Sequence, residues 1–196
     1  MSLYSILWRT DLSCFGYNFS TKAIERKEQS SYFRDIIGDY YNIIIDEDKN
    51  VGFDSEESVW VLGDRRVFHA RQDPYFKSRP GFSIDHAPAQ IAISFCLTSH
   101  GLAVSGDGAA GWSPKDVIFD CKANRMVWHA LEATDEISII LPCRDVGYDP
   151  AHHQPLIVYP AASSVSRTIR ATAPLIVDAC KQGDEVMANL LMDGFC

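Results

Sequence analysis

Short apolar segments separated by tight turns dominate the chain between Gln90 and Pro142. Each segment is rich in β-branched and aromatic residues, and glycine, proline and aspartate gather in the gaps between them. The segments that we interpret as strands are Gln90–Leu97, Leu102–Ser105, Asp116–Asp120, Met126–Leu131 and Glu136–Leu141. Strands at this spacing predict an antiparallel sandwich or barrel. Parallel strands would need long crossover connections, and no helix-length segment lies between these runs.

The region before Gln90 carries further strand patterns. The segments expected to form strands are Tyr40–Ile45, Ser58–Leu62, Arg66–Gln72 and Phe82–His86. A short helical turn is expected over Ser30–Gly38, where Gly38 would end it. The first thirty residues of the sequence mix polar and aromatic groups without a clear period. Ser5–Trp8 and Phe15–Phe19 are therefore interpreted either as short edge strands or as an arm.

A helical period replaces the strand pattern towards the C-terminal end. One predicted helix face carries Val165, Ile169, Thr172 and Ile176. Pro174 should kink or interrupt this helix, because proline lacks the N–H that the preceding turn needs. A second apolar stripe predicts another helix between Asp184 and Gly194. The fold class is therefore mostly β (α+β). We expect a β-barrel with an N-terminal arm over residues 1–160 and a helical hairpin over residues 161–196.

Composition is that of an ordinary globular protein, with 46% hydrophobic and 22% charged residues. The formal net charge of −8 repels phosphate, so the chain as given is a poor candidate for binding nucleic acid by itself. The N-terminal residues lack the basic start and apolar core of a secretory signal. No segment is apolar enough to cross a membrane. We therefore expect a cytoplasmic protein.

Six cysteines are present, and no pair has the C-x-x-C spacing of a zinc ribbon or a thioredoxin-like motif. They are Cys14, Cys96, Cys121, Cys143, Cys180 and Cys196. Several lie in or beside apolar strand segments, where a thiol behaves as a small hydrophobic group. We expect reduced thiols in the core rather than a disulfide framework.

The sequence contains no recognisable catalytic or metal motif. Cupin barrels that hold a metal usually carry His-x-His, and that spacing does not occur among His69, His86, His100, His129, His152 and His153. No Gly-x-Ser-x-Gly elbow is present, and the acidic residues are scattered in turns. Gly106–Gly108 precedes a strand rather than a helix, so a hairpin corner is expected there instead of a phosphate loop. We assign no catalytic residue, no metal and no cofactor.

The interior of the predicted barrel is the default binding site, because such pockets combine apolar walls with a few polar groups. The candidate apolar lining is Phe68, Phe95, Trp112, Phe119, Met126 and Trp128. The candidate polar groups are His69, Arg71 and His129. The alternative is that these residues only fill the core.

The two C-terminal helices also have two interpretations. Their apolar residues either cover an open end of the barrel or form a face shared by two copies of the chain. The residues of the candidate dimer interface are Leu175, Ile176, Ala179, Val186, Leu190 and Leu191.

Several segments together resemble the N-terminal sensor domain of AraC-type transcriptional regulators. These segments are Phe33–Asp35, Arg66–Arg71, Leu97–Leu102, Gly106–Gly108, Trp112–Asp120 and Glu132–Arg144. The resemblance covers roughly residues 30–195 and consists of turn and strand patterns. It departs from the family at Pro114-Lys115-Asp116, where the family often has Pro-Gly-Asp.

The resemblance implies a cupin-like barrel that senses a small-molecule effector and a helical segment that forms a homodimer. In the family, DNA is bound through a C-terminal helix-turn-helix domain, which is absent from this chain. The leading hypothesis is therefore the effector-binding and dimerisation domain of such a regulator, without enzymatic activity. One alternative is a small cupin enzyme acting on a sugar or organic acid, which would need a metal or an acid/base cluster. Another is a stand-alone interaction module.

Overall fold

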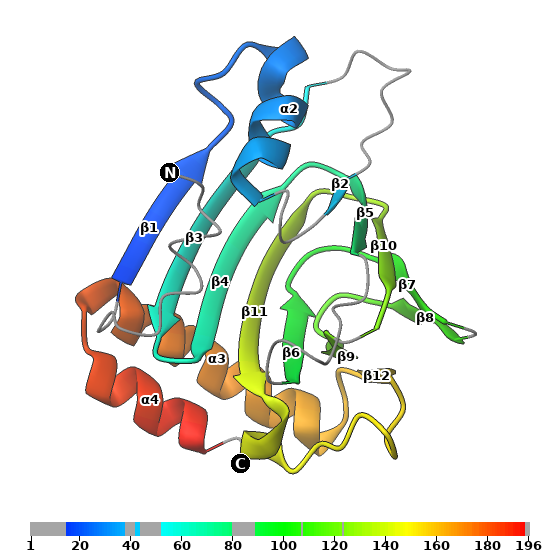
Figure 1. Ribbon diagram of the computed structural model, residues 1–196, viewed down its shortest axis with the longest axis vertical. Helices are drawn as coiled ribbons and strands as arrows, with labels where there is room; N and C mark the ends of the chain where they lie inside the picture. Colours follow the sequence, from blue (N-terminus) through cyan, green and yellow to red (C-terminus); the bar gives the residue numbers. More distant parts are fainter. Residues whose placement is uncertain are drawn as a thin grey trace.

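The structure is a computed structural model that describes residues 15–37, 42–43, 52–79, 89–106, 108–122 and 124–194 (Figure 1). The expected strands at Ser5–Trp8 and Phe82–His86 lie outside the described residues, as does most of Tyr40–Ile45. Among the described helices, none combines the length and apolar character needed to span a bilayer.

Two antiparallel sheets form the body of the protein. The larger sheet has the order β1-β3-β4-β11-β6-β9-β12, and the smaller has the order β2-β5-β10-β7-β8. The larger sheet consists of β1 (Phe15–Ser20), β3 (Ser55–Leu62), β4 (Arg65–Gln72), β6 (Gln90–Cys96), β9 (Val117–Cys121), β11 (Thr134–Pro142) and β12 (Leu156–Tyr159). The smaller sheet consists of β2 (Asn42–Ile43), β5 (Tyr75–Arg79), β7 (Gly101–Ser105), β8 (Gly108–Trp112) and β10 (Met126–Ala130). The predicted cupin-like antiparallel barrel is confirmed.

Three of these strands, β5, β8 and β12, are not predicted by the sequence pattern. Strand β8 has the sequence GAAGW, which lacks the β-branched residues that mark a strand. Strand β12 lies at the edge of the larger sheet and pairs only with β9 among the described strands. Such strands form because a partner supplies their hydrogen bonds, and a single sequence does not reveal that partner. The predicted turn at Ser30–Gly38 belongs to a longer helix, α2 (Arg26–Ile37).

Two helices follow the barrel, as predicted, after a short 3₁₀ turn, η2 (Cys143–Val146). Helix α3 (Ser164–Gln182) begins at Ser163, whose side chain accepts a hydrogen bond from the Ser166 amide. Helix α4 (Glu185–Asp193) begins at Asp184, which caps the Met187 amide in the same way. Pro174 does not interrupt α3, which continues to Gln182. Burial of the neighbouring turns against the sheet offsets the hydrogen bond that proline removes.

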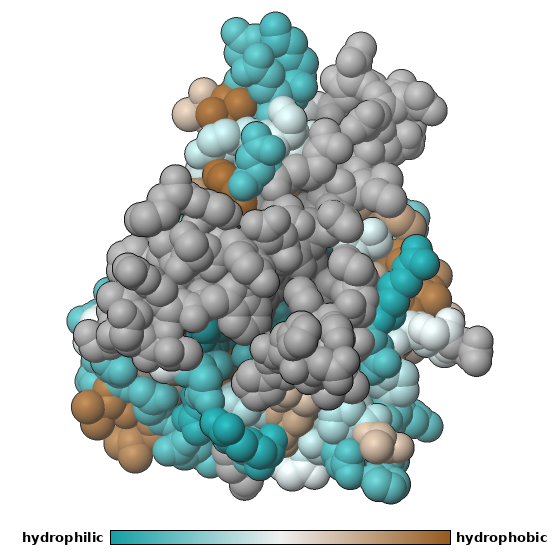
Figure 2. All heavy atoms as spheres, viewed as in Figure 1, coloured by the Kyte–Doolittle hydropathy of each residue, from teal (hydrophilic) through white to brown (hydrophobic). Residues whose placement is uncertain are grey.

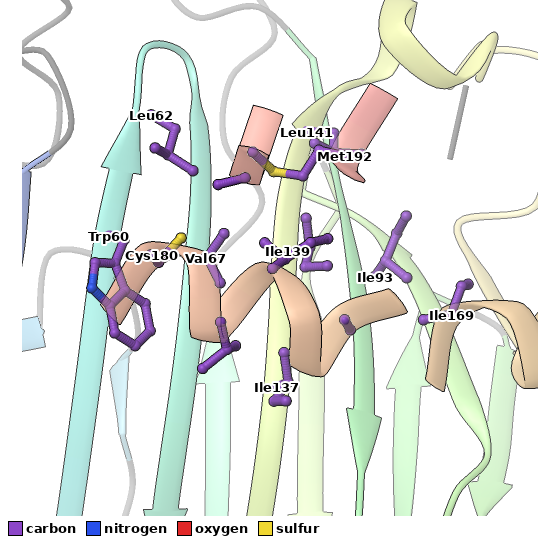
Figure 3. Close-up of a cluster of buried hydrophobic side chains, with 14 of the residues drawn as sticks. Trp60, Leu62, Val67, Ile93, Ile137, Ile139, Leu141, Ile169, Cys180 and Met192 are labelled. Carbon is purple, nitrogen blue, oxygen red and sulfur yellow. The ribbon is translucent and has the colours of Figure 1, made fainter. Parts of the chain in front are cut away.

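Both helices pack on the outer face of the larger sheet, away from the smaller sheet (Figures 1 and 3). The contact is apolar. Its sheet side includes Trp60, Val67, Ile93, Phe95, Ile137 and Ile139, and its helix side includes Ile169, Ala173, Ile176, Cys180, Ala188 and Met192. Removing this area from water stabilises the hairpin on the barrel. The four cysteines among the described residues, Cys96, Cys121, Cys143 and Cys180, are buried thiols as predicted.

The turn that departs from the family pattern keeps a geometry that suits glycine. Lys115 has a φ of 73°, in the left-handed region, and the Asp116 amide donates to the Ser113 carbonyl at 3.0 Å. Proline at the second position and positive φ at the third are typical of a type II turn, in which glycine is preferred at the third position. The Lys115 amide also donates to the Cys96 carbonyl at 2.8 Å, which ties the turn to the larger sheet.

We expect Lys115→Gly to stabilise the protein by about 0.5–1 kcal/mol, because it relieves the steric cost of positive φ. Chemical denaturation of both proteins measures the difference. Lys115→Ala is the matched control. It removes the same charge and side chain but keeps a Cβ, so it should leave the stability unchanged or lower. Equal gains from both substitutions would show that the backbone conformation is not the cause.

Candidate functional site: a polar cluster between the sheets

Polar side chains lie on the face of the larger sheet that meets the smaller sheet. Strand alternation places them there, because successive side chains of a strand point to opposite faces. Glu57, Ala70, Glu136 and Cys96 are direct cross-strand neighbours on β3, β4, β11 and β6. Lys77 and Tyr75 extend towards this row from β5 of the smaller sheet. The cluster therefore draws residues from both sheets.

Gln72 connects one half of this cluster. Its Nε2 donates to the Ser55 hydroxyl at 3.1 Å and to the Glu57 carboxylate. Its Oε1 accepts a hydrogen bond from the Lys77 ammonium. Lys77 also lies over the Tyr75 ring, with Nζ 4.0 Å from the ring centroid. These contacts provide hydrogen-bond partners for polar groups that burial has removed from water.

Glu136 organises the other half. Its Oε2 accepts from the Tyr75 hydroxyl at 3.2 Å, and its Oε1 accepts from the Ser138 hydroxyl at 2.7 Å. Ser138 lies 2.6 Å from the Ser94 hydroxyl, and since Ser138 donates to Glu136, it accepts from Ser94. A chain of oriented hydroxyls thus leads from β6 to the carboxylate on β11.

Burial shifts the protonation of one carboxylate in this cluster. The pKa of Glu57 is raised from its ordinary value of 4.5 to about 7. Desolvation is the largest cause, and the negative charge of Glu136 acts in the same direction. The nearby Lys77 ammonium opposes both effects. Glu57 can therefore gain or lose a proton near neutral pH.

Some buried polar atoms between the sheets lack a good hydrogen-bond partner within the described residues. The Thr134 and Ser105 hydroxyls have none, and the Trp112 indole Nε1 has only the Cys96 thiol, a weak acceptor, close to it. The Trp112 ring is fixed in place because it lies directly over Gly101, where a Cβ would come within 2.1 Å of Cζ2. Unpaired buried donors and acceptors cost free energy, so native proteins keep few of them, and each needs an explanation.

The two faces of the larger sheet separate the residues predicted to line the pocket. Phe68, Trp112, Met126 and Trp128 belong to the clusters packed between the sheets. Phe95 and Phe119 instead contact the helix layer on the outer face. His69 and Arg71 also lie on the outer face, where they bind Asp135, and His129 is exposed beside Phe76. The pocket assignment therefore stays a prediction for the first four residues, and the other residues lie elsewhere.

The sequence pattern did not reveal the polar centre of the cluster, Glu57, Gln72, Lys77 and Glu136. Alternation within the predicted strand Glu136–Leu141 groups Glu136 with Ser138 and Ile140 on one face, but it does not show which face is the inner one. Glu57 lies just before the predicted strand Ser58–Leu62, so the pattern gave no signal for it. A metal is not placed by the structure either. Among the described residues, no group of three His, Cys, Asp or Glu side chains is arranged to hold one.

The helical hairpin exposes part of the apolar face predicted for a dimer. Leu175, Val186 and Leu190 are 54%, 72% and 60% exposed. Ile176 and Ala179 instead face the sheet and are buried, and Leu191 packs at the edge of that core. Figure 2 shows an apolar patch at the lower left, where α3 ends and α4 begins.

We expect the free energy of unfolding to decrease between about pH 5 and about pH 8. The folded protein favours the protonated form of Glu57, so the stability that this proton contributes is lost as the pH rises through about 7. The full contribution is about 3 kcal/mol at most. Glu57→Gln should remove this part of the slope, measured by denaturation at several pH values. Glu56→Gln, on the opposite face of the same strand, should retain it. If the wild type and Glu57→Gln have the same slope, Glu57 does not titrate in this range.

Comparison with solved structures identifies the same fold elsewhere. No family model and no curated protein sequence matches the chain. The crystal structure of the AraC-like transcriptional activator CuxR matches 92% of this chain and 69% of that chain, at a TM-score of 0.69 and 10% identity.

Two further solved structures match smaller parts of the chain. The protein Ylba from E. coli covers 57% of this chain and 45% of its own, with a TM-score of 0.41 and 9% identity. The match with a Cupin 2 conserved barrel domain protein from Salinispora arenicola CNS-205 covers 46% of this chain and 68% of that chain, with a TM-score of 0.28 and 16% identity. The match with CuxR shows that the chain has the fold of that AraC-like activator over nearly its whole length, with two antiparallel sheets and a helical pair on the outer face of the larger one.

Proposed function

We propose that this chain is the effector-binding and dimerisation part of an AraC-type transcriptional regulator. The observation that carries the proposal is the buried polar cluster, together with the unpaired Thr134 and Ser105 hydroxyls and the weakly paired Trp112 indole between the sheets, within a fold shared with an AraC-like activator. DNA would be bound by a domain outside these 196 residues, in keeping with the net charge of −8. Such a regulator would act in the cytoplasm and would catalyse no reaction.

The effector in this proposal is a small polar molecule bound between the two sheets. Glu57 and Glu136 would accept hydrogen bonds from it, and the Trp112 indole would donate one. Phe68, Met126 and Trp128 would supply apolar contacts on either side. A ligand of this kind would favour one arrangement of the regulator by binding it more tightly than the alternative.

A purely structural role explains the cluster less well. Replacing buried charges by well-packed apolar residues is often neutral or stabilising, so packing alone gives little reason to keep two carboxylates and a lysine in a core. The unpaired atoms add a further cost. A ligand that completes these hydrogen bonds accounts for both features.

We expect Thr134→Val to stabilise the ligand-free protein by about 1 kcal/mol, because valine has the same shape and removes a buried hydroxyl that lacks a partner. The same change should weaken effector binding. Thermal shifts with a panel of sugars, polyols, carboxylic acids and amines identify a ligand of the wild type, and the shift should then shrink in the variant.

Thr98→Val is the matched control for this experiment. The Thr98 hydroxyl donates to the Ala133 carbonyl at 3.2 Å and accepts from the Asp135 amide at 3.1 Å, so its loss should destabilise the protein. A Thr134→Val variant that is less stable than wild type, with unchanged ligand shifts, would contradict the proposed site.

We also propose that the exposed apolar residues of α3 and α4 join two copies of the chain. Leu190→Asp should convert a dimer to a monomer, because a charge would be buried in the interface. Light scattering after size exclusion measures the mass. Leu131→Asp is the control, since Leu131 is equally exposed, at 60%, but lies in the turn after β10. A monomeric wild type, or a dimer that survives Leu190→Asp, would rule out this interface.

A further inference from the structure

A groove of about 450 Å³ lies on the outer face of the larger sheet, beside the end of α3. Most of its lining lies on the face opposite to the polar cluster, and Phe19 and Glu57 of the same strands also contribute atoms to it. Its floor consists of side chains from β1, β3 and β4, and Lys181 of α3 contributes to its lining. The floor residues are Asn18, Ser20, Glu56, Ser58, His69 and Arg71.

Strand register brings the floor residues into two short rows. Asn18, Ser58 and His69 are cross-strand neighbours, and Ser20, Glu56 and Arg71 form the next row towards the end of the strands. Asp135 on β11 continues the second row beside Arg71. Every side chain in these rows is polar, in contrast to the apolar rows under α3.

Asp135 holds two of the floor side chains in fixed orientations. Its Oδ1 lies 2.9 Å from His69 Nε2, and its Oδ2 accepts from Arg71 Nε at 3.1 Å. The Arg71 ion pair uses only Nε, so within the described residues its Nη1 and Nη2 groups keep their hydrogen-bonding capacity. His69 retains its second ring nitrogen, Nδ1. A guanidinium oriented in this way suits an anion with two oxygens.

Ion pairs neutralise part of the charge around the groove. The Glu56 carboxylate is paired with Lys22 at 2.8 Å, and Asp135 is paired with Arg71. In the described part of the chain, the Lys181 ammonium has no carboxylate partner.

We propose that this groove binds a small anion, a carboxylate or a phosphate, between Arg71 and Lys181. Arg71 provides the planar donor pair, and Lys181 provides a second positive charge from the helix. Ser58 and Asn18 supply neutral hydrogen-bonding groups. Because Arg71 belongs to the barrel and Lys181 to the last turn of α3, the bound anion links the barrel to the helical hairpin. This site does not depend on the effector proposed for the barrel interior.

Isothermal titration calorimetry with inorganic phosphate and with succinate, at ionic strength held constant with sodium chloride, tests the proposal. Saturable binding of at least one anion is expected. Arg71→Gln and Lys181→Gln should each weaken it by about fivefold, the effect of a partly solvent-screened charged hydrogen bond. Lys27→Gln is the control, because Lys27 is an exposed lysine on α2 that does not line the groove.

Each outcome of the titration decides the question. Binding of phosphate alone, or of succinate alone, supports the site and identifies the chemical source of the anion. No saturable binding by the wild type at tens of millimolar overturns the proposal. Binding that both groove variants retain overturns it as well, because the anion then lies elsewhere. Both substituted side chains are exposed, so circular dichroism should confirm that the variants fold.

Discussion

Both faces of the larger sheet are covered, and the rest of the structure depends on this arrangement. Every residue of the central strand β6 is buried. One face meets α3 and α4 through an apolar layer, and the other meets the smaller sheet. The apolar layer supplies much of the hydrophobic burial that a chain of this size needs. The inner face can therefore accept polar residues whose burial lowers stability.

This division of roles explains where the candidate sites lie. Glu57, Gln72, Lys77 and Glu136 meet between the sheets, where low polarity strengthens each hydrogen bond and raises the cost of each unpaired atom. Trp112, fixed over Gly101, adds a donor that has only the Cys96 thiol close to it. A cluster in this state is suited to recognition, because a ligand gains what the protein alone leaves unsatisfied.

The helical hairpin contributes both to the stability of the protein and to its proposed function. Its inward residues, such as Ile176, hold it on the sheet, and its outward residues, such as Leu190, remain in contact with water. A second copy would cover them. The groove beside Lys181 lies where the hairpin and the barrel meet, so an anion bound there would affect the same element.

The sequence by itself determined the fold class, most strands of the barrel and the two C-terminal helices, because alternation and helical period are local properties of the chain. It also predicted Phe68, Trp112, Met126 and Trp128 as residues between the sheets. Only the tertiary structure decided which face of a strand is inner and which is outer. It therefore placed Phe95 under α3, moved His69 and Arg71 to an outer groove, and brought Glu57 to Lys77 from strands distant in the sequence. Periodicity shows that two faces exist, but the covering of each face depends on long-range contacts that no local pattern contains.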